Sequence, residues 1–453
     1  MLFTSPLHEE IRALLLRRDA QALRAFCAPL HEADLAAALA EFEPADAAWV
    51  LTALDSDQGA WVLSHLGPDD QADIAPLLAD EQLARMISHM DADDRVDLVR
   101  HLPAERSDRV LHLLAQAERE DIRKLGSYGE GTAGALMTSE YATLSPSLTA
   151  REALEKLRLE APDKETIYYA YVIDGQRRLL GLVSLKDLIL ARPESRVAEF
   201  MHRELITARV DDPQEEVARK LAKYDLIALP VTNGNEALVG IVTFDDAQDV
   251  TEAEATTDFH RMGGSVSLEP TSLRDASIGL LVRKRLPWLL VLVVMNVFSG
   301  AGIAYFEDTI AAAVALVFFL PLLIDSGGNA GSQSATLMVR ALAVGDVRLR
   351  DWLQLLGREV FVALVIGLCM GLAVSCIGLF RGGPDIAVVV ALTMVVVVLV
   401  GSLIGMSLPF LMTRLRLDPA TSSAPLVTSL ADISGVLIYF SIATWYLGLP
   451  HGS

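Results

Sequence analysis

The sequence has few cysteines, fewer basic than acidic residues, and almost no histidine in its apolar C-terminal part. Its three cysteines, Cys27, Cys369 and Cys376, fit neither a disulfide framework nor a zinc pattern, which favours a reducing compartment. After residue 281 histidine occurs only at His451, which disfavours a soft-metal site with imidazole ligands there. The first residues predict an amphipathic helix and not a signal peptide.

Basic residues are scarce mainly in the first 280 positions. The chain has 38 Lys and Arg against 59 Asp and Glu, a net charge of −21. Residues 1–280 hold 28 basic and 50 acidic residues, whereas residues 281–453 hold 10 and 9. Such an acidic surface repels nucleic acid and attracts cations. We therefore expect divalent cations, and no nucleic acid, as partners.

Long apolar runs dominate the C-terminal part and predict a membrane domain. Five runs are long enough to span a bilayer, near 286–305, 309–341, 353–379, 386–411 and 423–448. An odd number of spans places the termini on opposite sides. If residues 1–280 are cytosolic, every basic residue of the loops and helix ends except Arg381 is on the inner side, as the positive-inside rule requires. The C-terminus is then outside.

A repeat of 12 residues organises the region 31–114. Turn-and-start strings recur from Glu43, Asp55, Gly67, Ala79, Asp91 and Pro103, each followed by a short apolar face. Acids and Pro at these positions are typical of helix entries. Short helices that cannot bury one face alone must stack, so the repeat predicts a small α-solenoid with acidic turns along one edge.

Two copies of a different unit follow, and each ends in Leu-x-Gly-x-Val-Ser/Thr-x-x-Asp. Each predicts strand, helix, strand, turn, strand and helix, with hairpins at Asp174–Gly175 and Asn233–Gly234. The pair resembles tandem CBS modules, which often bind adenine nucleotides. The resemblance implies a nucleotide site with ribose contacts. Its candidate residues are Ser184, Asp187, Thr243 and Asp246. The alternative for both aspartates is a helix N-terminal cap.

The second copy is much more acidic than the first, and its acids continue along the next helix to Asp258. That helix is expected to end near Met262, before Gly263–Gly264. A run of like charge usually marks a solvated face. Opposite an acidic solenoid edge, however, it repels that edge unless a divalent ion bridges the two, and hard oxygen ligands suit magnesium or calcium.

Residues 321–340, PLLIDSGGNAGSQSATLMVR, place polar groups within an apolar span. Asp325 and Asn329 are costly at membrane depth, so they should face a partner helix or a water-filled path. Pro321 and the nearby glycines are expected to loosen this helix. One alternative is a seam between helices made of small and polar residues; we favour a pore-lining helix.

Asp432 is the other intramembrane carboxylate, and Asp418 precedes its helix on the cytosolic side. One Asp432 per chain holds a divalent ion poorly, but a two-fold dimer would place two around one axis. Together with Asn329 amides they could hold hydrated magnesium through water. The alternative is a structural hydrogen bond between Asp432 and Thr428.

Two domains and three short segments carry a family resemblance: the acidic helical N-domain, the CBS-like pair, EATTDFHRMGG, GGNAGSQSA and LADISG. Together they resemble the MgtE-type magnesium channel family. The resemblance implies a homodimer in a bacterial inner membrane, with Asp432 and Asp418 at the pore and its cytosolic mouth. It also implies closure when cytosolic Mg²⁺ bridges acids of the N-domain, CBS pair and linking helix. These acids are Asp91, Asp94, Glu216, Asp225, Asp246, Asp249 and Asp258. Thr257 and Asp325 depart from the family pattern.

The predicted fold is an α-helical membrane protein with five transmembrane helices, a cytosolic α-solenoid and an α/β CBS pair. The expected parts are the N-domain (1–130), two CBS modules (131–195 and 196–249), a linking helix (250–284) and the pore domain (285–453).

Three other functions stay open. They are a Na⁺- or H⁺-coupled exchanger using Asp325, an intramembrane aspartyl protease, and a membrane-tethered nucleotide sensor. The protease is disfavoured because Gly-x-Gly-Asp is absent. The sequence does not separate Mg²⁺ from Mn²⁺, Co²⁺ or Ca²⁺ as the transported ion.

Overall fold

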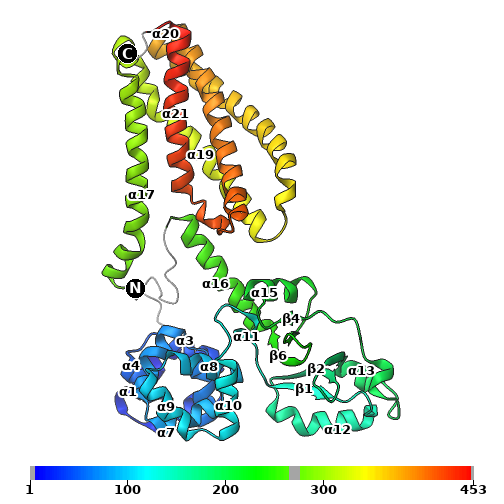
Figure 1. Ribbon diagram of the computed structural model, residues 1–453. Coiled ribbons are helices and arrows are strands. Elements are labelled where there is room, and N and C mark those ends of the chain that lie inside the picture. The colour runs from blue at the N-terminus through cyan, green and yellow to red at the C-terminus, as the bar shows by residue number, and fades with distance from the viewer. Residues whose placement is uncertain (1–5, 265–275, 450–453) are drawn as a thin grey trace. The chain divides into compact units, whose positions relative to one another are not determined.

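The computed structural model describes residues 6–264 and 276–449, which fold as two compact units (Figure 1). The first unit is Met1–Glu254 and the second is Ala255–Ser453. The predicted linking segment between 265 and 275 lies outside the described residues.

Short helices form the N-terminal part of the first unit. They are α1 (Pro6–Arg17), α2 (Ala20–Cys27), α3 (Glu32–Leu39), α4 (Pro44–Ala53), α5 (Ser56–Ser64), α6 (Pro68–Ile74), α7 (Asp80–Ser88), α8 (Ala92–His101), α9 (Ala104–Leu113) and α10 (Gln116–Leu125), with a 3₁₀ turn η1 at Ala75–Leu77.

The 12-residue repeat is confirmed, because α3 to α10 begin 12 residues apart. Each of these helices packs on the next but one, as α4 does on α6 and α6 on α8, so neighbouring repeats share one apolar core. The expectation of side-chain capping is wrong at these starts. Glu43, Asp55 and Asp91 occupy N-cap positions, but their side chains form no capping hydrogen bond.

Two small α/β modules complete the first unit. The first module comprises α11 (Ala133–Leu136), β1 (Tyr141–Leu144), α12 (Ala150–Glu160), η2 (Ala161–Asp163), β2 (Thr166–Ile173), β3 (Leu179–Ser184) and α13 (Leu185–Leu190). The second comprises α14 (Val197–Phe200), β4 (Ala208–Arg209), α15 (Gln214–Lys223), β5 (Ala228–Thr232), β6 (Leu238–Thr243) and the start of α16 (Phe244–Met262).

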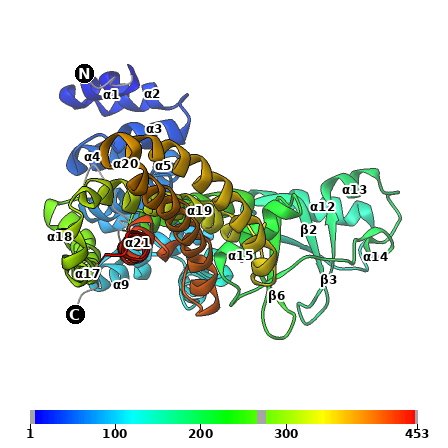
Figure 2. The ribbon, with the colours of Figure 1, turned by 90° about the horizontal axis from the view of Figure 1, so that it is seen from above.

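Both modules have the same sheet topology, with β1-β2-β3 and β4-β5-β6 each combining a parallel and an antiparallel pair. Their hairpins lie side by side, joined by a bridge between Arg178 and Ala237 (Figure 2). Each hairpin lies where Asp-Gly or Asn-Gly predicts it, but the connection has five residues. Arg177 and Glu236 take the left-handed conformation, with φ of 63° and 60°, in place of the glycines.

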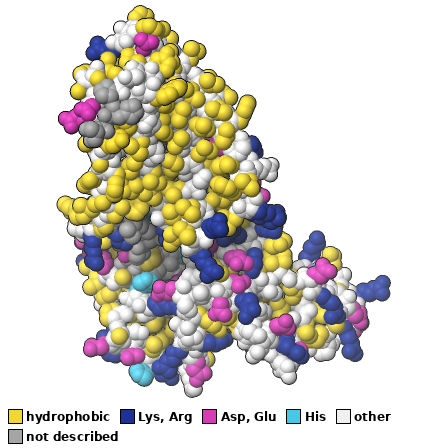
Figure 3. Space-filling model, turned by 45° about the horizontal axis from the view of Figure 1, so that its top comes forward, with side chains coloured by type: hydrophobic (Ala, Val, Ile, Leu, Met, Phe, Trp, Pro, Cys, Tyr) yellow, Lys and Arg dark blue, Asp and Glu magenta, His cyan; other side chains and the backbone are white. Residues whose placement is uncertain are grey.

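Apolar helices build the second unit, and hydrophobic side chains dominate the face of it that Figure 3 shows. They are α17 (Ile278–Tyr305), α18 (Glu307–Ala312), α19 (Ala315–Ala343), α20 (Trp352–Arg414) and α21 (Ala424–Leu447), with 3₁₀ turns η3 (Leu349–Asp351) and η4 (Pro419–Thr421). Among the described residues, 4 helices, α17, α19, α20 and α21, are long and apolar enough to cross a membrane.

Helix α20 is a hairpin of two arms. Its 63 residues would extend about 95 Å if straight, three times the hydrocarbon thickness. The backbone at Gly383 is not helical, with φ 83° and ψ −178°. Gly371 approaches Ala391 and Gly378 approaches Ala387, so the two arms run back along each other. Glycine at these positions permits the close approach, because an added Cβ would meet backbone atoms.

Glycines also bring α19 against the second arm of α20. An added Cβ on Gly331 would lie 2.7 Å from the Gly401 carbonyl oxygen, and one on Gly405 would meet the Gly331 carbonyl oxygen. The two Gly-xxx-Gly pairs therefore form a close crossing. The expectation that Pro321 and these glycines loosen α19 is wrong, because the helix is continuous from Ala315 to Ala343.

We predict that Gly405→Ala destabilises the membrane unit by about 1–3 kcal/mol, because the added methyl group must push α19 away from α20. Thermal unfolding in detergent measures this loss. Gly300→Ala on α17 is the matched control, since an added Cβ there meets no atom within 4 Å. Equal unfolding temperatures for the two variants would contradict the close crossing.

Candidate functional site

A cluster of carboxylates forms where α8, the start of β2 and the start of α16 meet. Glu165, Asp245 and Asp246 offer oxygens that all lie within 4.8 Å of one another. Two contacts position them: the Glu165 amide donates to the Glu140 carbonyl oxygen (3.1 Å), and Thr138 pairs with Ile241 of β6, which leads into α16. Three carboxylates this close form a ligand set suited to a hard divalent cation.

Helix α8 adds Asp91, Asp93 and Asp94 to this cluster. Asp93 interacts electrostatically with Asp246 and Glu165, and Asp91 with Asp245. One carboxylate oxygen of Asp93 and one of Glu165 are buried without a hydrogen-bond partner among the described residues. Buried polar atoms normally have a partner, so these oxygens are positioned for a ligand.

Burial and mutual repulsion raise the pKa values across this carboxylate cluster. Burial, with the charges of Asp246, Asp94 and Glu165, holds the pKa of Asp93 well above its usual range. Burial raises the pKa of Glu165 to about 8 and that of Asp246 to about 7, although hydroxyl hydrogen bonds oppose both shifts. Burial and Asp91 raise the pKa of Asp94 to about 6. These carboxyl groups therefore tend to retain protons near neutral pH, and a bound cation would displace those protons.

Of the predicted regulatory acids, Asp91, Asp94, Asp246 and Asp249 converge in this way, because Asp249 interacts with Asp245 and its neighbour Asp246. Glu216 instead pairs with Lys220 at 3.2 Å, and Asp225 is exposed after α15 with φ 51°. Sequence reasoning placed Asp93 on the acidic solenoid edge and Asp245 in the acidic run opposite it, although neither was chosen as a site residue. It missed Glu165, which nothing in the sequence marks.

The predicted nucleotide residues form two matching pairs. The Ser184 hydroxyl donates to Asp187 at 2.6 Å, and the Asp187 amide returns a bond to the Ser184 oxygen at 3.0 Å. Thr243 donates to Asp246 in the same way. Burial would raise the pKa of Asp187, but hydrogen bonds from Ser184 and His202 outweigh it and lower the pKa. Asp187 therefore takes part in capping the N-terminus of α13, as the alternative to nucleotide binding predicted. The carboxylate oxygens of Asp187 and Asp246 can still accept further hydrogen bonds from a ligand.

In the membrane unit, α19 presents two different faces. The glycine face packs on α20, whereas Asn329, Ser332, Gln333, Thr336 and Leu337 line a hollow of about 570 Å³. The Asn329 amide donates to Asp325 at 2.9 Å, and both side chains are exposed in the single chain. A polar face of this kind on a lipid-length helix needs water or a partner against it.

Asp432 of α21 lies near this face, and Asp325 is the charge that acts on it. One oxygen of Asp432 is buried without a hydrogen-bond partner among the described residues. Thr428 does not serve as its partner: the Thr428 hydroxyl donates to the Ala424 carbonyl oxygen (2.9 Å) and faces Ser332 (3.2 Å). The structural alternative for Asp432 therefore finds no support.

Asp418, the predicted mouth acid, contacts the end of α16. Arg261 forms an ion pair with one oxygen of Asp418, and the other accepts from the Ala420 amide at 2.7 Å. Burial and the Asp418 charge raise the pKa of Asp258, which Arg261 partly offsets. Asp258, Arg261 and Asp418 therefore lie close to one another in the second unit.

Comparisons with known proteins agree with this geometry. The family model for a divalent cation transporter, MgtE, matches residues 320–442, that for the MgtE intracellular N domain matches 30–131, and that for the CBS domain matches 133–194 and 197–250. The chain is 43% identical to the magnesium transporter MgtE of Thermus thermophilus over 335 residues, 74% of each chain. It is 34% identical to that of Bacillus subtilis over 338 residues, also 74% of each.

Solved structures match the first unit. The cytosolic domain of the Mg²⁺ channel MgtE in complex with ATP aligns with TM-score 0.52 and 40% identity, covering 54% of this chain and 99% of that one. The soluble part of a magnesium transporter aligns with TM-score 0.51 and 32% identity, covering 55% and 99%. Membrane helices, an intracellular N-domain and a CBS pair define a divalent cation transporter of the membrane, and not an enzyme. The chain belongs to the MgtE family.

We predict that Mg²⁺ binding to the solubilised protein tightens from about pH 6 to about pH 8 and releases protons. Protons compete with the cation while Asp94, Asp246 and Glu165 titrate with pKa values of about 6, 7 and 8. These pKa values are raised on folding, so without Mg²⁺ the stabilisation that protons provide is lost as pH rises through them. Added Mg²⁺ should restore the melting temperature at the higher pH.

Calorimetric titration in two buffers of different ionisation enthalpy measures the protons released. Glu204→Gln, at an exposed acid with no assigned role, provides a control outside the cluster. An affinity that is the same at both pH values would show that these carboxylates are not the ligands.

Proposed function

We propose that this protein conducts Mg²⁺ through a water-filled path lined by α19 and α21 at the contact of two copies of the chain. The observation that carries the proposal is an Asp432 oxygen that has no hydrogen-bond partner within residues 6–264 and 276–449, beside an exposed polar face of α19. In a single chain that face is open on one side. A second copy related by a two-fold axis would close it and bring two Asp432 carboxylates to one place.

The chemistry of this path fits hydrated magnesium. Mg²⁺ releases its waters reluctantly and is commonly held by one or two carboxylates through water. Asp432, Asp325 and Asn329 supply oxygens, and Asp418 supplies another at the cytosolic mouth. Passive entry of a divalent ion gains about 4.6 kcal/mol per 100 mV of negative-inside potential, which is enough to drive uptake. The relatives that transport magnesium support Mg²⁺ over Mn²⁺, Co²⁺ or Ca²⁺.

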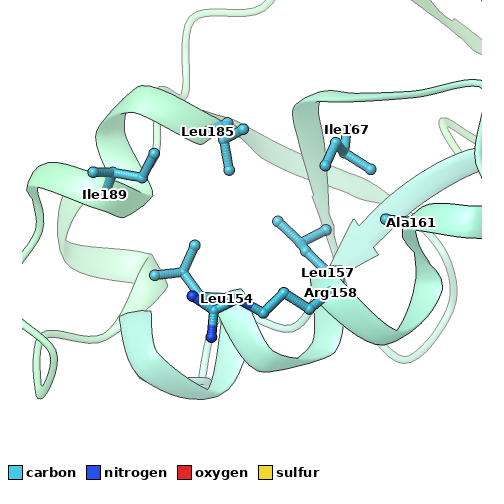
Figure 4. A pocket seen from close by; sticks show the side chains of 7 residues that line it. All are labelled: Leu154, Leu157, Arg158, Ala161, Ile167, Leu185 and Ile189. Carbon is cyan, nitrogen blue, oxygen red and sulfur yellow. The ribbon is translucent and has the colours of Figure 1, made fainter.

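A surface of the first module also supports a homodimer. Leu154, Leu157, Ile167, Leu185 and Ile189 line an apolar hollow there, with Arg158 at its side (Figure 4). Ile189 is 65% exposed and Leu190 73%. Such an apolar patch is costly in water, and a second copy offers an identical patch to cover it.

The proposed gate is the carboxylate cluster of the first unit together with α16. Without Mg²⁺ the charges of α8 and α16 repel, which favours an open arrangement. Mg²⁺ bound among Glu165, Asp245 and Asp246 stabilises the compact arrangement but not the open one. Only such a difference in binding free energy between the two arrangements shifts their populations. Glu216, Asp225 and Asp258 are assigned to further regulatory positions by resemblance to the family.

The remaining assignments extend the family membership. The division into N-domain, two CBS modules, linking helix and five-span pore domain stays a prediction, as does an outside C-terminus in a bacterial inner membrane. The two arms of α20 support the count of five. ATP is proposed at the CBS pair, with Ser184, Asp187, Thr243 and Asp246 contacting the ribose, because the similar solved cytosolic domain holds ATP.

We predict that Asp432→Asn lowers Mg²⁺ uptake into proteoliposomes by at least about tenfold, because a hydrated divalent ion loses the charge that holds it in the path. Fluorescent indicator inside the vesicles measures uptake under an imposed negative-inside potential. Asp385→Asn is the matched control, since Asp385 is an exposed acid in the α20 turn.

If uptake by the native protein does not depend on the potential but does depend on a Na⁺ or proton gradient, the protein is a coupled exchanger and not a channel. Equal uptake by the Asp432→Asn and Asp385→Asn variants would show that Asp432 does not line the ion path.

We predict that Glu165→Gln raises the cytosolic Mg²⁺ concentration needed for half-closure by about tenfold. The substitution removes one of three clustered carboxylates and part of the repulsion, so the difference between open and compact arrangements shrinks. Current or flux recorded against Mg²⁺ on the cytosolic side measures closure. Glu204→Gln, an exposed acid of the same module pair, should leave closure unchanged. A shift in the control variant equal to that in Glu165→Gln would indicate a surface-charge effect only.

A further inference from the structure

A second hollow, unrelated to the ion path, lies at one end of the α20 hairpin. Its volume is about 690 Å³. It lies between η3 with the start of the first arm and the end of the second arm. Its lining residues are Leu349, Arg350, Trp352, Ile404, Ser407, Leu408, Phe410, Leu411 and Arg414.

The wall of this α20 hollow is apolar and opens toward the outside of the helix bundle. Leu349 and Leu411 are each 48% exposed, while Phe410 is buried behind them. Ile404, Leu408 and Leu411 are spaced four and three residues apart, so they form one stripe along the second arm. The stripe belongs to a helix that is long and apolar enough to cross a membrane. A hydrocarbon chain fits a wall of this composition.

The rim of the hollow is basic. Arg350 and Arg414 are exposed, and Trp352, two residues after Arg350, is half-buried and also lines the hollow. Arg350 has one acidic neighbour, Asp351, whose oxygen is 3.7 Å from its Nε. For Arg414 no ion pair is found within the described residues. Two guanidinium groups against one carboxylate leave net positive charge, suited to a phosphate.

The orientation of the chain places this rim at the cytosolic membrane surface. Helix α17 follows the intracellular domains and crosses outward, and α19 returns, so the segment from Ala343 to Trp352 is on the inner side. Anionic headgroups are found at this level, and basic pockets between helices on this side bind them. Trp at the boundary between apolar and polar regions is typical of a membrane interface.

We propose that the hollow formed by η3 and the second arm of α20 is a binding site for an anionic phospholipid. The headgroup phosphate lies between Arg350 and Arg414, and an acyl chain runs along Ile404, Leu408 and Leu411. A free phosphate would use only the rim. A second copy of the chain would cover the wall but bring two more arginines to an already basic rim, which disfavours that occupant.

The test uses the full-length protein, delipidated in neutral detergent. Added phosphatidylglycerol should raise the unfolding temperature of the native protein and remain bound in native mass spectrometry, whereas phosphatidylcholine should do neither. Arg350→Gln with Arg414→Gln should weaken phosphatidylglycerol binding by about 25-fold, roughly fivefold for each arginine. The matched control is Arg340→Gln with Arg358→Gln, which removes the same charge at the same membrane surface outside the hollow and should bind normally.

Three outcomes would overturn the proposal. Equal weakening in both double variants would mean that the lipid responds to surface charge alone. Equal stabilisation by sn-glycerol 3-phosphate would mean that the rim binds a soluble anion and the wall no chain. Cross-linking of Ser407→Cys between two copies would mean that another copy covers the hollow. Leu408→Gln separates the wall from the rim: it should weaken phosphatidylglycerol binding without changing binding of the soluble phosphate.

Discussion

Carboxylate groups held close together and partly out of water are the constraint on which both candidate sites depend. In the first unit, carboxylate oxygens of Glu165, Asp245 and Asp246 all lie within 4.8 Å of one another. One buried oxygen of Asp93 has no hydrogen-bond partner among the described residues. In the second, Asp432 has an unpartnered oxygen near Asp325. Burying charge in this way opposes folding unless a cation compensates it. Both arrangements are therefore costly to the isolated chain, and the proposed cations would offset that cost.

One continuous helix carries charged groups of both sites. Helix α16 begins with Asp245–Asp246 in the carboxylate cluster and ends with Arg261, which pairs with Asp418. Its 19 residues extend about 28 Å as a rigid rod.

Local sequence patterns predicted the helices and strands well, but they did not predict contacts between segments that are distant in the sequence. The 12-residue repeat predicted where α4 to α9 begin, because a turn and a short helix are local features. It did not predict that Asp91 makes no capping bond and lies close enough to Asp245, more than 150 residues away, for their charges to interact. Glu165 was missed for the same reason: its role arises only when the segment at Thr138–Glu140, which contacts Glu165, pairs with β6.

The hairpin turns show the same limit at a smaller scale. Asp174 and Asn233 mark the turns correctly because each side chain accepts two backbone amides of its own loop. Those bonds favour a five-residue connection, which moves the left-handed position from the glycines to Arg177 and Glu236.

The GGNAG segment shows why two explanations of a sequence can both hold. A seam of small residues and a pore-lining helix were treated as alternatives for residues 321–340. Residues four apart share a helix face, and residues two apart lie about 200° around it. Gly327 and Gly331 therefore face α20, while Asn329, between them, faces away into the polar hollow. The close glycine crossing holds α19 against α20, and Asn329 and Asp325 lie on its other side. The seam is therefore compatible with the proposed pore-lining role of α19 and does not compete with it.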